Sequence, residues 1–334
     1  MKSKAGSGAG SGAGSYSAPW WLPGGHLQTI YAALAPAPLV AYRRERWDTP
    51  DGDFIDLDWA GPAENPGASQ PAGKSSPVLA LFHGLEGSSA SPYARAIAAR
   101  ALAMGWRCVV PHFRGCSGEL NRLPRAYHSG DSEEIGWILK ALAGDAEPLY
   151  ACGISLGGNA LLKYLGEQGA NAALRKAASI SAPLDLAAAG RALDAGLSRE
   201  IYTRIFLRTL KKKTFAKLKE QQISIDPLRL KNARTFWEFD DTVTAPLHGF
   251  LGADDYWARA SSGPWLGKIR VPTLVMNARN DPFMPESALE EVSGMLRDIP
   301  SCVTLEFPSD GGHAGFPGRG HWLARRALDF LSAP

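Results

Sequence analysis

The hydrophobic positions of this chain follow two patterns. Residues 42–47 and 54–59 alternate between apolar and polar side chains, with turn residues at 50–52 between them, which predicts an antiparallel hairpin. From Pro77 onward, short continuous apolar runs alternate with amphipathic segments. Apolar runs bounded by turn residues are typical of strands buried on both faces of a parallel sheet.

The apolar runs predict six strands in the sequences VLALF, RCVVPHF, PLYACGIS, KAASISA, PTLVMNA and CVTLEF. The amphipathic segments between and after them predict helices over residues 93–104, 132–142, 158–165, 287–296 and 321–331. Strands that alternate with helices indicate an α/β fold, in which helices cover both faces of a mostly parallel central sheet.

The alternation is interrupted between about residues 186 and 268. This stretch is helical in pattern and contains the most cationic run of the chain, residues 204–219. Because ligands of open α/β sheets bind at the carboxyl ends of the strands, we predict a helical cap inserted over that edge. Residues 1–18 are rich in Gly, Ala and Ser and are expected to form a flexible tail, which leaves residues 19–334 as one domain with the cap.

Composition narrows the class of protein. With 45% hydrophobic and 21% charged residues the chain is typical of globular proteins, and its net charge of +3 is too small to indicate nucleic-acid binding. No apolar run approaches the roughly 18 to 20 residues that cross a bilayer, and the tail lacks the apolar core of a signal peptide. We therefore expect a cytoplasmic protein. The four cysteines are scattered, which predicts reduced core thiols rather than a zinc site.

The most specific local signal is the segment Gly153-Ile154-Ser155-Leu156-Gly157, where an apolar strand runs directly into a predicted helix. Small residues two places either side of the serine permit a very tight turn, which raises the hydroxyl above the sheet. We predict Ser155 as a nucleophile. The N–H of Leu156, at the start of the helix, is expected to stabilise the oxyanion of a reacting carbonyl.

A second loop supports the prediction of a serine nucleophile. The strand that ends at His83-Gly84 precedes a loop of the kind that supplies the other oxyanion N–H in such folds, and here that donor is expected to be Leu85. His83 itself is interpreted as a structural, hydrogen-bonded histidine. Its position offers it no role as a base.

A serine hydroxyl needs a base, and the base needs a carboxylate that fixes its tautomer. Asp281 follows one apolar run and His313 lies in a glycine-bearing loop after the next, so the order Ser155, Asp281, His313 is the one expected for this fold. Asp185, after the strand that follows the elbow, is an alternative acid. This chemistry requires no metal and no organic cofactor.

The remaining candidates are interpreted as structural. Asp310 is expected to form a turn, and His321, at the start of the last helix, to lie on the surface or cap that helix. The other histidines do not follow strands in the required order; they are His26, His112, His128 and His248. Arg114 and Asp131 are predicted to form a buried ion pair.

With these motifs the chain resembles the YheT-like branch of the α/β hydrolases. The resemblance is carried in order by PWWLPGGHLQT, FHGLEGSS, PHFRGCSGELNRLPRAYHSGD, GISLGGNALLKYLGE, HGF with DDYW, NARNDPFMP and GGHAGF. It implies one α/β-hydrolase domain with a helical cap and a carboxylesterase-like activity, and its triad maps onto Ser155, Asp281 and His313. Because relatives of the branch include esterases, phospholipase-like enzymes and acyltransferases, the acyl acceptor stays open.

The sequence thus predicts a serine hydrolase that cleaves acyl esters, with a small-molecule or lipid-like substrate. The alternatives are an acyltransferase that forms esters from alcohols, and a non-catalytic binding module on the same scaffold. The cationic run of the cap is interpreted as a solvated helix face, with weak contact to an anionic lipid surface as the other possibility. Acyl chain length and oligomeric state are not indicated.

Overall fold

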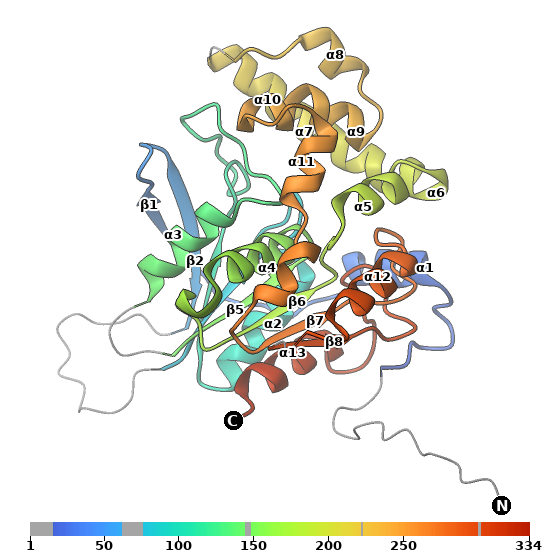
Figure 1. The fold of residues 1–334 in the computed structure, drawn as a ribbon. Coiled ribbons are helices and arrows are strands. Elements are labelled where there is room, and N and C mark those ends of the chain that lie inside the picture. Colours follow the sequence, from blue (N-terminus) through green and yellow to red (C-terminus); the bar gives the residue numbers. More distant parts are fainter. Residues whose placement is uncertain (1–15, 62–75, 144–147, 222, 300–301) are drawn as a thin grey trace, which may run out of the picture.

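An eight-stranded sheet forms the centre of the protein in the computed structural model, which describes residues 16–61, 76–143, 148–221, 223–299 and 302–334 (Figure 1). Most of the predicted tail, residues 1–15, lies outside the described residues. The strands in chain order are β1 (Arg43–Asp48), β2 (Phe54–Ala60), β3 (Val78–Phe82), β4 (Arg107–Pro111), β5 (Leu149–Ile154), β6 (Lys176–Ile180), β7 (Thr273–Met276) and β8 (Val303–Glu306).

The spatial order of the strands is β1-β2-β4-β3-β5-β6-β7-β8. The predicted hairpin is present, with β1 antiparallel to β2 in the register that pairs Arg43 with Trp59 and Asp48 with Phe54. Strand β2 also runs antiparallel to β4, and all other neighbouring pairs are parallel. The predicted α/β fold with a mostly parallel sheet is therefore confirmed.

Alternate side chains of each buried strand face two different helical layers, because successive side chains of a strand point to opposite faces. In β3, Leu79 and Leu81 belong to a buried cluster with α2 (Pro92–Ala103) and α13 (Trp322–Ser332). Ala80 and Phe82 belong to another, with α3 (Ser132–Leu142), α4 (Leu156–Gln168) and α12 (Glu286–Leu296). Both faces are covered, which explains why the strand sequences are continuously apolar rather than alternating.

Five helices outside the cap match the predicted segments to within a few residues, and two described elements, α1 and the short 3-10 helix η1, are additional. Together these elements are α1 (Gly25–Leu34), α2 (Pro92–Ala103), α3 (Ser132–Leu142), α4 (Leu156–Gln168), η1 (Gly169–Asn171), α12 (Glu286–Leu296) and α13 (Trp322–Ser332). Helix α1, which was not predicted, and the preceding residues 19–24 form the N-terminal arm.

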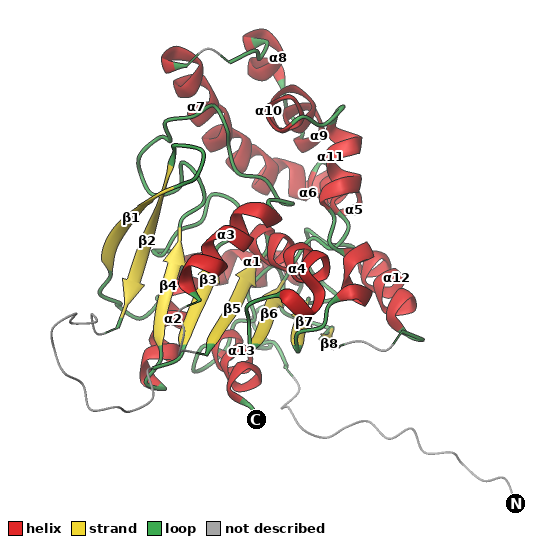
Figure 2. Ribbon diagram, turned by 60° about the vertical axis from the view of Figure 1, so that its left-hand side comes forward, coloured by secondary structure: helices red, strands yellow, loops and turns green. Residues whose placement is uncertain are grey.

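Between β6 and β7 the described chain is helical. Figures 1 and 2 both show the central helices of this segment beyond the ends of the strands, where they form the cap. The elements are α5 (Leu186–Leu193), α6 (Gly196–Ser198), η2 (Arg199–Thr203), α7 (Arg204–Glu220), α8 (Pro227–Asn232), α9 (Phe236–Phe239), η3 (Asp240–Thr244), α10 (Ala245–His248), α11 (Ala253–Ala260) and η4 (Gly263–Lys268). We propose about residues 186–268 as the limits of the cap and residues 19–334 as those of the domain.

The prediction of core cysteines is correct for only part of the set. Cys108 and Cys152 are buried between strands and helices, Cys116 is partly exposed, and Cys302 is exposed. Cys302 precedes the short strand β8 at the edge of the sheet, where fewer neighbours cover the chain. Among the described residues, no helix combines the length and the apolar character that crossing a membrane requires.

Candidate active site

Ser155 stands at a sharp turn between β5 and α4, with φ 53° and ψ −119°. A β-carbon on Gly157 would lie 2.5 Å from the carbonyl oxygen of His83, and one on Gly153 would lie 2.6 Å from that of Gly157. Only glycine fits at either place, because side chains there would collide with backbone of the neighbouring strand or of the turn itself. The elbow therefore has the strained geometry that the sequence predicts.

The side chains of Ser155, His313 and Asp281 form one hydrogen-bonded line. The Nε2 atom of His313 lies 2.8 Å from Ser155 Oγ, and its Nδ1 atom lies 2.9 Å from Asp281 Oδ2 and 3.1 Å from Oδ1. Because a carboxylate only accepts hydrogen bonds, Nδ1 carries the proton, and Nε2 is left to accept from the serine hydroxyl. These three side chains, distant in sequence, are brought together as predicted.

The carboxylate of Asp281 is held in place by its own turn. Its Oδ1 atom also accepts a hydrogen bond of 2.8 Å from the N–H of Phe283, and its side chain is fully buried. The ring of Phe283 stacks on the imidazole of His313, with centroids 3.9 Å apart. The imidazole is thus fixed both by the carboxylate and by an aromatic face.

The loop after β3 lies against the serine, since a β-carbon on Gly84 would be 3.3 Å from Ser155 Cβ, and three of its four backbone N–H groups at residues 84–87 have partners. The N–H of Gly84 donates to Tyr93 Oη, that of Glu86 to Tyr127 Oη, and that of Gly87 to the carbonyl of Gly84. The intervening N–H, on Leu85, donates to no group among the described residues. Leu85 is the residue predicted to supply an oxyanion donor from this loop, and that role stays a proposal.

The second predicted donor, Leu156, is the first residue of α4. Its N–H has no partner inside the helix, because the residue four places earlier, Cys152, belongs to β5. The start of a helix also carries a partial positive charge. Both features suit an N–H that stabilises a negatively charged oxygen.

His83 has the structural role that its position suggests. Its ring is completely buried, Nδ1 lies 2.7 Å from the carbonyl of Gly84, and Nε2 accepts from the N–H of Phe113 at 3.1 Å. Burial lowers the pKa of His83 to about 3. The ring is therefore neutral near pH 7, and it links the start of the loop after β3 to the backbone at Phe113.

The N-terminal arm supports the histidine loop, which the sequence analysis missed. The Oγ1 atom of Thr29 in α1 accepts a hydrogen bond of 2.8 Å from the N–H of His313, and Gln28 Oε1 accepts one of 2.7 Å from the N–H of Gly311. Gln28 is fully buried and also donates to the side chain of Asp310. The polar HLQT stretch inside an otherwise apolar arm was the available signal.

Asp310 and Asn280 complete this support. Asn280 donates from Nδ2 to Asp310 and accepts at Oδ1 from the N–H of Gly312, at 3.0 Å and 2.9 Å. Asp310 is thus used in holding the loop, and it does not bond to His313. The predicted role in turn formation stays a prediction, since the printed partners of its carboxylate are the side chains of Gln28 and Asn280.

Among the described residues, the other acid and histidine candidates bond to neither Ser155 nor His313, although His128 and His321 line the same cavity. Asp185 caps α5 by accepting from the N–H of Ala188, so it is not placed to orient His313. His321 precedes α13 with an exposed side chain that makes no capping bond. The others contact neighbours of their own: His26 stacks on Tyr202, His112 bonds to Asp58, and His128 faces His248.

The predicted ion pair between Arg114 and Asp131 is wrong. The buried guanidinium of Arg114 bonds to Glu134 at 2.6 Å and to Asp53 at 3.1 Å, whereas Asp131 pairs with Arg125 at 2.6 Å. Three acidic residues surround Arg114 once the hairpin and α3 are in place, a proximity created by tertiary structure.

A cavity of about 830 Å³ lies between the body and the cap and contains Ser155 and His313 in its wall. Much of the wall is apolar, and the cap contributes Ile201, Phe206 and Phe236 to it. Cavities of this size and lining bind small organic molecules. The site is therefore open to a substrate with a sizeable apolar part.

Comparison with known proteins places the chain in a family. The profile of the α/β hydrolase fold matches residues 77–319. The chain belongs to the α/β-hydrolase family. The hydrolase is 38% identical to YheT of Escherichia coli K12, whose name describes a candidate esterase, over 92% of this chain and 90% of that protein. The resemblance to the YheT-like branch is thereby confirmed.

One further relative and one solved structure are similar to this hydrolase. It is 29% identical to the human protein named phospholipase ABHD3, over 95% of this chain and 78% of that protein. A solved structure of the Pyrococcus furiosus esterase Pf2001 superposes with a TM-score of 0.56 at 16% identity, and covers 89% of this chain and 96% of that one. The structural likeness supports the fold.

Proposed function

We propose that this hydrolase cleaves carboxylic esters through a Ser155-His313-Asp281 triad. The observation that carries the proposal is the 2.8 Å contact between Ser155 Oγ and His313 Nε2, with the carboxylate of Asp281 on the other ring nitrogen. The names of the relatives, esterase and phospholipase, support an ester as substrate. The apolar cavity favours a small-molecule or lipid-like ester over a polar one.

In the first step Ser155 Oγ attacks the ester carbonyl while its proton passes to His313 Nε2. The carbonyl oxygen becomes negative and is stabilised by the N–H groups of Leu85 and Leu156. The C–O bond to the alcohol then breaks, and the departing alkoxide takes the proton from His313. The product of this step is an acyl-enzyme.

In the second step a water molecule gives its proton to His313 Nε2 and attacks the acyl carbon. A second oxyanion forms in the same place, and its collapse returns the proton to Ser155 Oγ and releases the carboxylic acid. Throughout, Asp281 keeps the imidazole in one tautomer and stabilises its positive charge. All proton transfers can be carried out by His313.

The test is Ser155→Ala with a p-nitrophenyl ester as substrate. We expect turnover to fall by several orders of magnitude, because loss of a triad nucleophile leaves only residual catalysis. Labelling by a fluorophosphonate probe should disappear in the same variant. Turnover retained by Ser155→Ala would refute the triad, and a wild-type protein inactive on an ester panel would favour the non-catalytic binding module.

Acyl transfer to alcohols and contact with anionic lipid are two further proposals, each with its own test. Transfer of the acyl group to an alcohol would appear as ethyl ester when ethanol is added to the assay. Contact with anionic lipid would appear as sedimentation with vesicles that depends on their anionic content. Within the basic run, Lys211, Lys213 and Lys217 bond to other parts of the protein, so the solvated-face and lipid interpretations concern the remaining cationic residues. A cytoplasmic location remains the expectation from sequence.

A further inference from the structure

Glu86 lies in residues 84–87, the oxyanion loop, and has an unusual backbone conformation. Its φ is 56°, a region that side-chain-bearing residues seldom adopt, and it directly follows Leu85. The hydroxyl of Tyr127 accepts from the N–H of Glu86 at 2.9 Å and donates to Glu86 Oε1 at 2.8 Å. The tyrosine therefore ties the backbone and the side chain of Glu86 into one unit, and this unit sets the path of the loop.

The same carboxylate binds a residue of the cap. Lys213 Nζ in α7 donates to Glu86 Oε1 at 2.7 Å. The side chain of Glu86 is 10% exposed and that of Lys213 32%, so the pair is partly shielded from water. Both residues line the cavity that contains Ser155. One contact thus joins the cap to the residue next to an oxyanion donor.

Lys213 and Lys217 on one face of α7, and Gln221 directly after the helix, dock on the body. Lys217, four residues on, donates to the carbonyls of Leu123 and Arg125, both at 2.7 Å. Gln221, four further on, donates to the carbonyls at positions 121 and 122. Lys213 and Lys217, four residues apart, share a helix face, and Gln221 adds a contact at the end of the helix, so the three contacts together fix α7 on the body.

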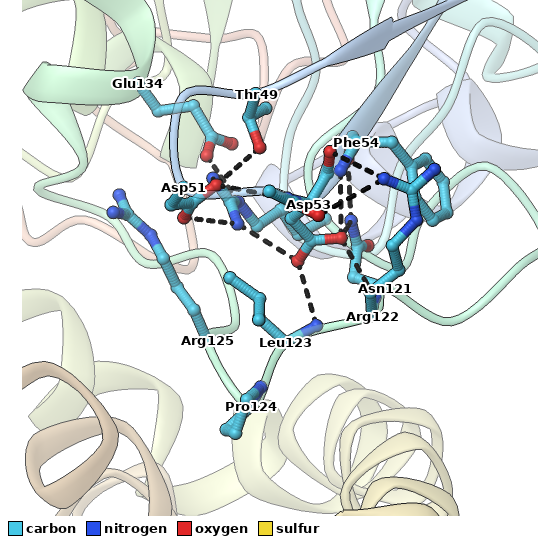
Figure 3. Close-up of polar contacts among 12 residues, drawn as sticks. Thr49, Asp51, Asp53, Phe54, Asn121, Arg122, Leu123, Pro124, Arg125 and Glu134 are labelled. Carbon is cyan, nitrogen blue, oxygen red and sulfur yellow. Dashed lines mark hydrogen bonds and ion pairs between the residues drawn. The ribbon is translucent and has the colours of Figure 1, made fainter.

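The body segment at these contacts is itself rigidly held. Asp53, which is fully buried, accepts hydrogen bonds from the side chain of Asn121 and from the N–H groups of Arg122 and Leu123 (Figure 3). The bonds lie between 2.9 Å and 3.2 Å. Helix α7 therefore docks on a segment that hydrogen bonds hold in place. This docking defines the position of Lys213 beside the oxyanion loop.

We propose that Glu86 is a positioning residue of the oxyanion loop, and that its ion pair with Lys213 couples the placement of the cap to the geometry of the Leu85 N–H. The inference rests on the proposed ester hydrolysis. Neither residue touches the reacting atoms. Their role is to keep the loop in the one conformation in which the N–H of Leu85 stays free and faces the serine.

The experiment compares Glu86→Gln, Lys213→Met and the double variant with wild type, and uses Lys212→Met as the matched control. Lys212 is the neighbouring lysine on the exposed side of α7. An oxyanion donor contributes about 10²- to 10³-fold to kcat, so its misplacement is expected to lower kcat by roughly tenfold. KM should change by less than about twofold, since substrate is bound before the oxyanion forms.

Coupling predicts specific relations among the variants. The double variant should be no slower than the slower single variant, because Lys213 acts through Glu86. Lys213→Arg should restore most of the activity, and Lys212→Met should behave as wild type. A wild-type kcat in Glu86→Gln would overturn the positioning role, and a wild-type kcat in Lys213→Met would overturn the link to the cap.

A second measurement does not depend on turnover. Hydrogen exchange followed by mass spectrometry should show faster exchange in residues 84–87 and in α7 for Lys213→Met, and not for Lys212→Met. Unchanged exchange in the loop would contradict the coupling even if no ester is cleaved. Failure of the proposed function would appear separately, as turnover that survives in Ser155→Ala.

Discussion

The imidazole of His313 is positioned by contacts on several sides. The carboxylate of Asp281 fixes one ring nitrogen, the ring of Phe283 fixes its plane, and Thr29 Oγ1 accepts from its backbone N–H. The last contact comes from a helix 284 positions earlier in the chain. Because proton transfer depends on the distance between Ser155 Oγ and Nε2, a displaced backbone at His313 affects catalysis directly.

Thr29→Val tests this backbone contact. Valine keeps the shape of threonine but leaves the N–H of His313 without an acceptor, which costs about 1–3 kcal/mol for a buried group. We expect kcat for a p-nitrophenyl ester to fall by about tenfold with KM changed less, since the lost hydrogen bond acts on His313 and valine keeps the volume of threonine at the cavity wall. Steady-state kinetics and urea unfolding of the same preparations measure both effects.

A matched control for this change is Thr209→Val. Thr209 is an exposed helical threonine whose Oγ1 donates to the carbonyl of Phe206, much as Thr29 donates to that of Gly25. It supports no loop. Equal losses of kcat in the two variants would argue against a specific role of the arm at His313.

At the scale of elements, the elbow depends on how closely α4 and β5 approach β3. The position of a β-carbon on Gly157 would be 2.5 Å from the carbonyl oxygen of His83 and 2.6 Å from that of Phe82. Strand and helix are therefore in backbone contact at the site. Any side chain at Gly157 must separate them.

Gly157→Ala is expected to destabilise the protein and to inactivate it. Forced separation of packed backbone costs about 1–3 kcal/mol or more, and it moves the N–H of Leu156 away from the serine. Urea unfolding and ester turnover measure the two effects. Gly294→Ala in α12 is the control, since nothing lies within 4 Å of its β-carbon, and a helical Gly→Ala change stabilises by up to about 1 kcal/mol. A Gly157→Ala protein as stable and active as wild type would contradict this account.

The parts of the site that could be predicted from sequence are those determined by local chain geometry. The elbow around Ser155 needs a strand, two glycines and a helix within a few residues, and the order of Asp281 and His313 follows from the sheet. These cues lie next to the residues that they explain. The contacts of Thr29 and Arg114 could not be predicted, because each depends on which distant loops meet after folding.

At the scale of the whole molecule, three parts of the chain enclose the cavity. The end of α1 contributes Leu34, the body contributes the elbow, and the cap contributes Ile201 and Ile205. Leu34 and Ile205 line the cavity although they are 79% and 60% exposed, so they lie at its mouth. An apolar mouth leading to an apolar interior favours substrates with a hydrocarbon part.

The activity is therefore expected to rise with acyl length. Each buried methylene contributes about 0.8 kcal/mol, so two more methylenes should raise kcat/KM by roughly tenfold until the cavity is filled. A series of p-nitrophenyl esters from acetate to octanoate measures this.

Ile201→Ser should lower kcat/KM for octanoate severalfold and leave acetate nearly unchanged, because Ile201 belongs to the cap and we expect only the longer chain to reach it. The control Leu228→Ser, on an exposed side chain of α8, should alter neither. A response that is flat across the series would show that the acyl group does not occupy the cavity, and the apolar wall would then have to bind the alcohol part of the ester.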